Sequence, residues 1–446
     1  MLRRIDLTAS LGGAGLGSAA LRAVLPRATG SAHAADEAVA PILAAVRDRG
    51  SAAVLDFGEQ FDRVRPASLR VPAEVIDASE RALAPALRGA LTESIRRARL
   101  GHEAQLPSEQ VTEIVSGGTV TQRWIPVRRV GLYVPGGLAP LASSVVMNVV
   151  PAQVAGVAEI AVASPPQQSA GGWPDATILA ACALLGVTEV YAAGGAQAIA
   201  LLGYGSAAHD DVPGACAVDP VDVITGPGNV YVTAAKRALR GTVGIDSEAG
   251  PTEIAVIADG TANPRYVAAD LISQAEHDPH AASVLITDSL VLADAVDSLL
   301  PEMVAATRHA DRVRQALTGE QSATVLVASL DDAVTVADAY GAEHLEVQTA
   351  DAASVAARIR NAGAVFVGPF SPVSLGDYCA GSNHVLPTSG GARYSSALNT
   401  TTFLKSVQLI DYSRAALAGA AGAIAALTAA ENLPAHGEAV AVRIAP

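Results

Sequence analysis

The stretch Val130-Gly-Leu-Tyr-Val-Pro-Gly-Gly137 opens a series in which a short apolar run ends in a tight turn and an alanine-rich segment follows. Similar β-rich runs recur at 160–163, 189–192 and 221–225, each separated from the next by a stretch with helical character. Such alternation is typical of βαβ units, in which neighbouring strands run parallel. The sequence therefore predicts a parallel sheet over this part of the chain.

A second series of the same kind begins after residue 251. Its β-rich runs lie at 253–258, 282–287, 324–328 and 364–367. We therefore expect an α/β protein with two Rossmann-like domains, each with a mostly parallel sheet and flanking helices. The first domain is expected at 126–250 and the second at 251–386.

The two ends of the chain lack this pattern. Helical periodicity at 31–58 and 75–105 predicts an N-terminal helical segment, residues 1–125, that packs on the second α/β domain. Residues 387–446 are predicted to form a small helical C-terminal arm, because 411–432 are one alanine-rich helical stretch. A piece of this size does not fold alone. We expect it to dock on another unit, either of the same chain or of a second subunit.

Composition narrows the class of protein. The chain of 446 residues is too long for one compact core, and its 50% hydrophobic but only 4% aromatic content suits sheets covered by helices. A net charge of −14 argues against a nucleic-acid partner or an anionic membrane. No apolar span has membrane length, and Asp6 and Arg22 interrupt the apolar N-terminus. Together with three cysteines of unpaired spacing, Cys182, Cys216 and Cys379, these features predict a cytoplasmic protein.

Four strings in the second half of the chain carry groups that can bind a divalent metal or move a proton. They are Gln274-Ala-Glu-His277, Glu343-His344, Gly376-Asp377-Tyr378 and His436. Gln274 and His277 are three residues apart in a segment with helical character, so they share one face. Imidazole nitrogen and carboxylate oxygen suit Zn²⁺ at a catalytic site that keeps one position open. Each residue alone is more often a solvated or structural side chain, so the metal hypothesis requires that the strings converge.

Three glycine-rich turns follow β-rich runs of the first series. They are Tyr133-Val-Pro-Gly136-Gly137, Gly194-Gly195-Ala-Gln197 and Gly226-Pro-Gly228-Asn229. Open α/β sheets bind ligands at the carboxyl ends of their strands, where glycine allows a close approach and helix N-termini attract phosphate. Plain turn chemistry is the alternative for each one. The common fingerprint Gly-x-Gly-x-x-Gly between a strand and a helix is absent, so a nicotinamide cofactor would be held in another way.

Taken together, these residues resemble histidinol dehydrogenase, the zinc- and NAD-dependent enzyme family of the last two steps of histidine biosynthesis. The resemblance runs almost from end to end, from Leu2-Arg-Arg-Ile-Asp-Leu7 to Ala435-His436. Its most specific strings, in order, are Gly131-Leu-Tyr-Val-Pro-Gly-Gly137, Gly194-Gly-Ala-Gln-Ala-Ile199, Gly226-Pro-Gly-Asn229, Ala249-Gly-Pro-Thr-Glu253, Ser273-Gln-Ala-Glu-His277, Ala342-Glu-His-Leu345, Gly376-Asp-Tyr378 and Ser382-Asn-His-Val-Leu-Pro387.

The resemblance implies a role for each candidate residue. The ligands of one Zn²⁺ per subunit fall on Gln274, His277, Asp377 and His436. The catalytic pair falls on Glu343 and His344, and the NAD contacts fall on Tyr133, Gln197 and Asn229. The substrate L-histidinol would contact Thr252 and Glu431, together with Glu343, His344 and the zinc ligands. One departure is visible, since the family usually has Ser at the position of Thr252.

The resemblance also implies a reaction and an assembly. L-histidinol would be oxidised through L-histidinaldehyde to L-histidine with two NAD⁺. His344 would act as the general base and Glu343 would activate water, which requires surroundings that raise the pKa of its carboxyl. In the family the C-terminal arm crosses to the partner of a homodimer, so Glu431 and His436 would complete the neighbour's site.

Two other readings compete with this one. A related zinc- and NAD-dependent dehydrogenase could act on another polar alcohol such as a sulfonated diol, but Glu431 favours a cationic substrate over a sulfonate. A two-lobed periplasmic metal receptor would require a cleavable signal and would not require a Glu-His pair. Neither expectation fits this sequence, because its apolar N-terminus is interrupted and it contains a Glu-His pair.

Overall fold

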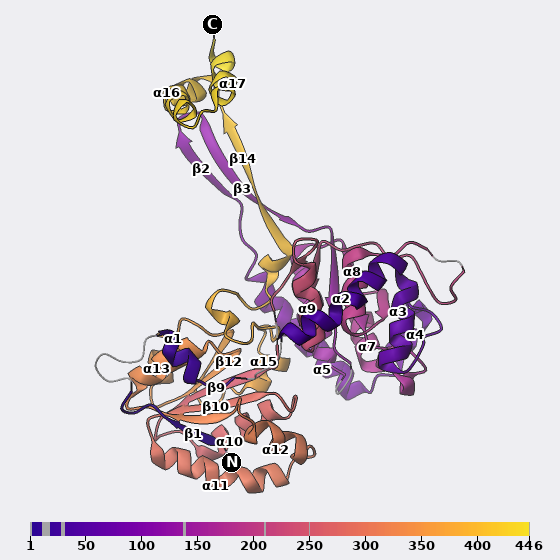
Figure 1. Ribbon diagram of the computed structural model, residues 1–446, viewed down its shortest axis with the longest axis vertical. Coiled ribbons are helices and arrows are strands. Elements are labelled where there is room, and N and C mark those ends of the chain that lie inside the picture. The colour runs from indigo at the N-terminus through magenta and orange to yellow at the C-terminus, as the bar shows by residue number, and fades with distance from the viewer. Residues whose placement is uncertain are drawn as a thin grey trace.

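The computed structural model describes residues 2–10, 18–27, 32–136, 140–208, 211–248 and 250–445. These residues form two α/β domains side by side and a long arm that projects from them (Figure 1). Gly137, the last residue of the first predicted glycine turn, and Ala249 lie outside the described residues. The prediction of an α/β protein with two mostly parallel sheets is confirmed.

The first domain contains a five-stranded parallel sheet with the order β6-β5-β4-β7-β8. The strands are β4 (Arg129–Tyr133), β5 (Glu159–Ser164), β6 (Glu189–Ala192), β7 (Val223–Thr225) and β8 (Gly244–Ile245). Because successive side chains of a strand point to opposite faces, Leu132 and Tyr133 enter two different hydrophobic cores. Four of these strands coincide with the β-rich runs, whereas the two-residue β8 is too short to leave a pattern.

Helices cover both faces of this sheet. One face packs against α4 (Ala73–Arg81), α5 (Pro85–Glu103), α6 (Ala142–Ala155) and α7 (Ala176–Leu184). The other packs against α2 (Ala32–Arg49), α3 (Ser51–Phe57), α8 (Gly195–Tyr204) and α9 (Val230–Leu239). Four short helical turns occur elsewhere along the chain. They are the π-helical turn η1 (Gly58–Asp62) and the 3-10 turns η2 (Gln168–Ala170), η3 (Gly391–Arg393) and η4 (Thr400–Phe403).

The second domain contains a six-stranded parallel sheet with the order β1-β11-β10-β9-β12-β13. Its strands are β1 (Arg3–Asp6), β9 (Glu253–Ala258), β10 (Ala282–Thr287), β11 (Ala323–Leu326), β12 (His344–Gln348) and β13 (Ala364–Val367). The helices are α1 (Ser18–Val24), α10 (Pro264–Ala275), α11 (Leu290–Ala305), α12 (Ala310–Thr318), α13 (Leu330–Tyr340), α14 (Ala352–Ala356) and α15 (Val373–Tyr378). The sequence pattern indicates neither β1 nor β12.

The N-terminal segment divides between the two domains, which differs from the expectation for residues 1–125. Only β1 and α1 join the second domain, where β1 pairs with β11 and α1 packs on α13. Helices α2 to α5 pack instead on the first domain, against α6 to α9. The physical reason is that both faces of a parallel sheet must be covered, and the first domain supplies only four helices of its own.

The arm is not only helical. An antiparallel sheet of β2 (Gln110–Val115), β3 (Gly118–Pro126) and β14 (Leu404–Tyr412) forms its stem, with the order β14-β3-β2. Helices α16 (Arg414–Ala430) and α17 (Pro434–Ile444) form its tip (Figure 1). Strand β14 therefore falls in the segment predicted as helical, and it pairs with a strand almost three hundred residues earlier in the chain. In the described part of the chain, no helix is both long and apolar enough to cross a membrane.

Candidate functional site

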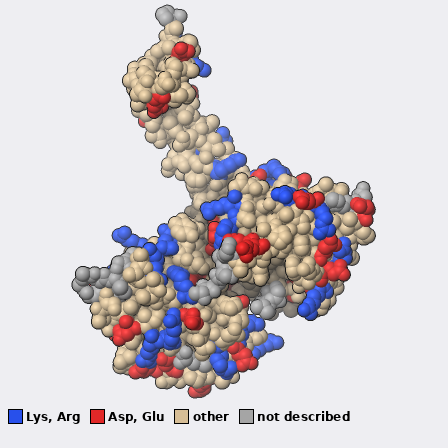
Figure 2. All heavy atoms as spheres, in the orientation of Figure 1, with Lys and Arg blue, Asp and Glu red and all other residues tan. Residues whose placement is uncertain are grey.

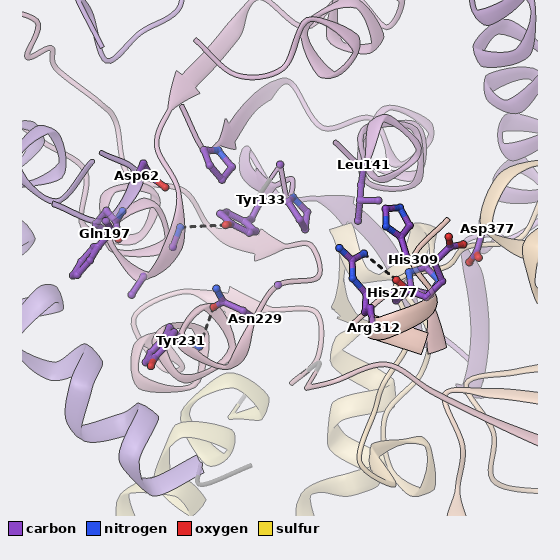
Figure 3. Close-up of a pocket in the computed structure, with 18 of the residues that line it drawn as sticks. Asp62, Tyr133, Leu141, Gln197, Asn229, Tyr231, His277, His309, Arg312 and Asp377 are labelled. Atoms are coloured by element: carbon purple, nitrogen blue, oxygen red, sulfur yellow. Dashed lines mark hydrogen bonds between the residues drawn. The ribbon is translucent and has the colours of Figure 1, made fainter. Parts of the chain in front are cut away.

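A cavity of about 890 Å³ lies between the two α/β domains. The first domain contributes Tyr133, Gln197 and Asn229 to its wall, and the second contributes His277 and Asp377 (Figure 3). Tyr133, Gln197 and Asn229 follow the carboxyl ends of β4, β6 and β7, which is where open α/β sheets place their ligands. His277 instead follows the C-terminal end of α10, and Asp377 lies near the end of α15. The structure therefore brings the predicted nucleotide turns and two of the predicted metal ligands to one cavity.

The wall from the first domain is built from the ends of β4, β6 and β7. The Tyr133 hydroxyl accepts a hydrogen bond from the backbone N–H of Gly195 at 3.1 Å. Burial raises the pKa of Tyr133 to about 12, so its phenol is neutral. Asn229 caps helix α9, because its Oδ1 accepts from the backbone N–H groups of Tyr231 and Val232, both at 3.1 Å. Local hydrogen bonds thus fix two of the three turns.

The turn that contains Asn229 is also fixed by contacts of its first residue, Gly226, with buried groups of the first domain. Gly226 has a φ of 117°, and a Cβ there would lie 2.0 Å from the carbonyl oxygen of Tyr133, so only glycine fits. The Gly226 N–H donates to Asp246 Oδ2 at 2.8 Å, and its carbonyl accepts from Lys236 Nζ at 3.0 Å. Lys236 and Asp246 form a buried ion pair. The backbone of the turn is therefore clamped by a pair of charges that water does not reach.

On the opposite wall, Gln274 lies in the last turn of α10 and His277 follows the end of that helix. The backbone N–H of His277 bonds to the carbonyl of Gln274 at 3.3 Å, so the two residues keep the one-turn spacing predicted for them. Gln274 is buried, and its Nε2 donates to Thr252 Oγ1 at 2.5 Å. Its Oε1 is buried without a hydrogen-bond partner. An unpartnered buried oxygen is costly unless a ligand or an ion completes it.

Asp377 lies in the short helix α15. Burial raises the pKa of its carboxyl, and the nearby imidazoles of His344 and His277 oppose that rise. Gln274, His277 and Asp377 are an amide oxygen, an imidazole and a carboxylate, which together fit the donor preferences of Zn²⁺. Among the described residues, no three His, Cys, Asp or Glu side chains gather closely enough to hold a metal ion. Of the three candidate ligands, only His277 and Asp377 belong to these four residue types.

Two of the predicted site residues, Glu431 and His436, lie far from this cavity within the same chain (Figure 1). Glu431 ends helix α16 and His436 begins helix α17, and both side chains are exposed. Figure 1 places both helices at the tip of the arm, away from the two sheets. The structure of one chain therefore does not bring Glu431 or His436 to the cavity.

Glu343 and His344 are adjacent residues at the start of β12, and both are buried. Glu343 Oε2 accepts from the Thr252 hydroxyl at 2.5 Å and from the backbone N–H of Glu253 at 2.9 Å. Burial nevertheless raises the pKa of Glu343 to about 7. The carboxyl thus titrates near neutral pH, where a general base is most effective.

The hydrogen bond of His344 determines which ring nitrogen carries its proton. Nδ1 lies 3.2 Å from the carbonyl oxygen of Glu253, and because a carbonyl can only accept, Nδ1 is the donor. Nε2 is then unprotonated, and it is buried without a partner. Burial lowers the pKa of His344 to about 4, so the ring is neutral and can accept a proton at Nε2.

Sequence reasoning gave no role to His384, although it lies in one of the strings that carry the resemblance. Its Nδ1 lies 3.1 Å from the carbonyl oxygen of Asp377, and its Nε2 lies 3.1 Å from Ser144 Oγ on α6. Burial lowers its pKa to about 4. A neutral imidazole thus links helix α6 of the first domain to the segment that carries Asp377.

Two carboxyl groups meet beneath the site. Gln348 Nε2 donates to Asp270 Oδ2 and to Glu346 Oε2, both at 2.9 Å, and Glu346 Oε1 accepts from the backbone N–H of Val373 at 3.0 Å. Burial, and then the neighbouring Asp270, raise the pKa of Glu346 to about 9. The pair therefore shares a proton at neutral pH. It joins α10, β12 and α15, the three elements that carry Gln274, His344 and Asp377.

Comparison with known proteins identifies the family. The sequence model of histidinol dehydrogenase matches residues 25–444. The chain belongs to the histidinol dehydrogenase family. It is 61% identical over 444 residues to the histidinol dehydrogenase of Nocardia farcinica, covering 99% of each chain, and 60% identical over 423 residues to that of Thermobifida fusca, covering 95% and 94%. The crystal structure of histidinol dehydrogenase from Elizabethkingia anophelis superposes with a TM-score of 0.90 at 30% identity, covering 99% of this chain and 98% of that one.

The shared proton of Glu346 makes stability depend on pH. Folding raises the pKa of Glu346 from 4.5 to about 9, so its contribution is present below pH 4.5 and is lost as the pH rises toward 9. The free energy of unfolding should fall across this range by at most about 1.4 kcal/mol per pH unit from this group. Glu346→Gln keeps an acceptor for Val373 and a donor for Asp270, and should flatten the decline. Chemical denaturation between pH 5 and pH 9 measures it.

The matched control for this experiment is Glu302→Gln, a change of the same type at an exposed position on α11. Its pH profile should follow that of the unmodified protein. A Glu346→Gln profile with the same slope as the control would show that Glu346 does not hold a proton in the folded protein.

Proposed function

We propose that this member of the family oxidises L-histidinol through L-histidinaldehyde to L-histidine at a zinc site between its two α/β domains. Two NAD⁺ take up one hydride each, and water supplies the second carboxylate oxygen. The observation that carries the proposal is the cavity itself. It places Tyr133, Gln197 and Asn229 across from His277 and Asp377 (Figure 3). A dinucleotide on the first wall would thus bring its nicotinamide toward a substrate held on the second.

Zinc is proposed to bind Gln274, His277 and Asp377 of one chain and His436 of a second copy. The buried Oε1 of Gln274, which has no hydrogen-bond partner, supports this assignment. When bound, the ion acts as a Lewis acid that orients the amine and imidazole nitrogens of the substrate. Holding the alcohol carbon in a fixed position near the nicotinamide then supplies much of the rate enhancement.

His344 is proposed to take the alcohol proton at Nε2 during the first hydride transfer and to act again in the second. Its Nδ1–H is fixed on the carbonyl of Glu253, so the ring can turn only its unprotonated nitrogen to the substrate. The Asp377 carboxylate raises the pKa of His344 against the effect of burial. That field stabilises the imidazolium that forms when the proton arrives.

Glu343 is proposed to activate the water that adds to the aldehyde. Its pKa of about 7 permits the carboxyl to accept a proton without leaving the neutral pH range. The Thr252 hydroxyl donates to Glu343 and accepts from Gln274, so Thr252 aligns these two residues and can contact the substrate. A serine, the usual residue of the family here, supplies the same hydroxyl.

The arm is proposed to dock on a second copy of the chain and to bring Glu431 and His436 to its site. The arm exposes apolar side chains on both its stem and its tip, among them Val111, Ile114, Ile410, Leu427 and Val442. Figure 2 shows that charged side chains gather over the two domains and are sparse on the arm. An exposed apolar surface of this kind is typical of a protein interface. Glu431 would then face the cationic amine of histidinol, whereas it would repel a sulfonated diol.

All three cysteines are free thiols in the structure. The cytoplasmic location predicted from the sequence stays a prediction.

The stoichiometry of the reaction tests the proposed function. Zinc-loaded protein incubated with histidinol and NAD⁺ should form two NADH for each histidine. NADH is followed by its absorbance and histidine by chromatography. One NADH per molecule of aldehyde, with no histidine, would contradict the four-electron oxidation.

The roles of the two histidines are separable. His344→Asn should lower turnover by roughly 100-fold or more while zinc content stays unchanged, because a general base contributes about that factor. His277→Asn should instead remove the metal. Zinc analysis and NADH formation measure both effects, and exposed His280→Asn serves as the matched control. A His344→Asn protein that lost its zinc but kept its rate per bound metal would reverse the assignment.

Mixing two inactive variants tests the shared site. In a dimer of one His277→Asn chain and one His436→Asn chain, one of the two sites has an intact body and an intact arm. Random exchange makes about half of the dimers mixed, so activity should recover to about a quarter of the unmodified level. Differently tagged chains verify the exchange. Mixed dimers that stay inactive would show that the arm does not complete the neighbour's site.

A further inference from the structure

Asp62 is a cavity residue that sequence analysis did not find. It lies at the end of the cavity beside Gln197, and Figure 3 shows His277 and Asp377 at the opposite end. Its charge also raises the pKa of Tyr133, which lies between the two ends. In the proposed function the nicotinamide must face the metal-binding end. The adenosine half of the dinucleotide therefore points toward Asp62.

The carboxyl group of Asp62 lacks a partner in this position. Its Oδ2 is buried and accepts no hydrogen bond. The carboxyl is desolvated enough that its pKa rises to about 6, so it is ionised at pH 8. A buried carboxylate oxygen without a donor is unfavourable, and a ligand that brings hydroxyl groups would satisfy it.

The backbone around Asp62 has a conformation that requires outside support. Asp62 ends the π-helical turn η1, and turns of this kind are frequent at functional sites. The next residue, Arg63, has a φ of 57°, which is rare for a residue other than glycine. Its carbonyl accepts from Gln168 Nε2 at 2.7 Å, a contact from a distant part of the chain. The fold thus holds the turn, and with it the carboxyl, at the cavity.

The neighbouring Phe61 adds an apolar surface. Its ring is half exposed, lines the same cavity and stacks on Phe57 with a centroid separation of 5.6 Å. A flat apolar ring beside a carboxylate matches an adenosine, which joins a flat base to a sugar with two adjacent hydroxyls. Dinucleotide-binding folds often place an acidic side chain on these hydroxyls.

We propose that the Asp62 carboxylate accepts hydrogen bonds from the ribose hydroxyls of the adenosine half and thereby selects NAD⁺ over NADP⁺. The inference rests on the proposed binding of NAD⁺ in this cavity. A 2′-phosphate would replace one hydroxyl donor by a dianion next to a carboxylate. The only arginine that lines the cavity among the described residues, Arg312, donates to the carbonyl of Glu276 and lies near His277 (Figure 3). Arg312 therefore lies at the opposite end of the cavity from Asp62 and cannot offset the repulsion between a 2′-phosphate and the Asp62 carboxylate.

Steady-state kinetics of the zinc-loaded enzyme at pH 8, with NAD⁺ and NADP⁺ each varied, test the inference. Asp62→Asn should lower kcat/KM for NAD⁺ by roughly 10- to 100-fold, which corresponds to the loss of hydrogen bonds to a charged group. It should raise kcat/KM for NADP⁺, so the preference for NAD⁺ should shrink by more than either change. KM for histidinol and zinc content should stay unchanged. Glu59→Gln, an exposed change on the same turn, is the matched control.

Binding to the unmodified enzyme gives a second test that needs no variant. Isothermal calorimetry should detect ADP-ribose at lower concentration than 2′-phospho-ADP-ribose. Equal affinities would overturn the inference, as would an Asp62→Asn enzyme that keeps the NAD⁺ preference of the Glu59→Gln control.

A companion variant separates this inference from the proposed cofactor site. Asn229→Ala should raise KM for NAD⁺ if the cavity binds the dinucleotide. If Asn229→Ala has that effect and Asp62→Asn leaves the cofactor preference intact, only the role of Asp62 is wrong. If neither variant changes KM for NAD⁺, the cofactor binds elsewhere and the proposed site is wrong as well.

Discussion

The hydroxyl of Thr252 is the contact on which the arrangement of the site depends. It donates to Glu343 and accepts from Gln274, so a single oxygen atom joins the start of β12 to the end of α10. Because the Gln274 amide nitrogen is bound to this hydroxyl, the amide oxygen must point the other way, where it is left without a protein partner. The orientation of a proposed metal ligand and that of a proposed base are therefore set together. Serine would preserve both bonds, whereas an isosteric valine would break both.

Further hydrogen bonds between neighbouring elements position the residues around the site. The shared proton of Asp270 and Glu346 ties α10, β12 and α15 together from below, through Gln348 and the backbone of Val373. His384 ties Asp377 to helix α6 of the other domain. Because α10 packs on β9 and β9 pairs with β12, these elements lie next to one another, so short contacts suffice to connect their side chains. The buried polar groups that would destabilise a core elsewhere are here paired with one another and act as positioning residues.

The sequence predicts the strands and helices that follow a regular apolar pattern. It misses the elements whose residues are stabilised by contacts with distant parts of the chain. Strand β9 is an apolar run after its first residue, Glu253, and is predicted at its observed bounds. Strand β12 contains the buried polar residues Glu346 and Gln348, so it does not show the apolar pattern of a buried strand. Only the structure shows that Gln348 is hydrogen-bonded to Asp270 on α10. Asp62 gives no local signal either, because neither the spacing nor the charge of its neighbours shows that the cavity ends there. Gln274, His277 and Asp377 could be chosen as candidates because their residue types suit one ion, and the structure places His277 and Asp377 at the cavity.

The position of the arm follows from a different constraint. Strands β2, β3 and β14 pair only with one another, so the arm extends away from both sheets rather than covering either. An extended antiparallel ribbon with apolar side chains on its surface has little core of its own, and its helices α16 and α17 bury almost no residue. A surface outside the chain would stabilise it, in line with the proposed docking on a second copy. If the arm docks on a second copy of the chain, as proposed, the contact that stabilises the arm also brings His436 to the proposed metal site. Assembly and metal binding would in that case be a single linked equilibrium, with each favouring the other.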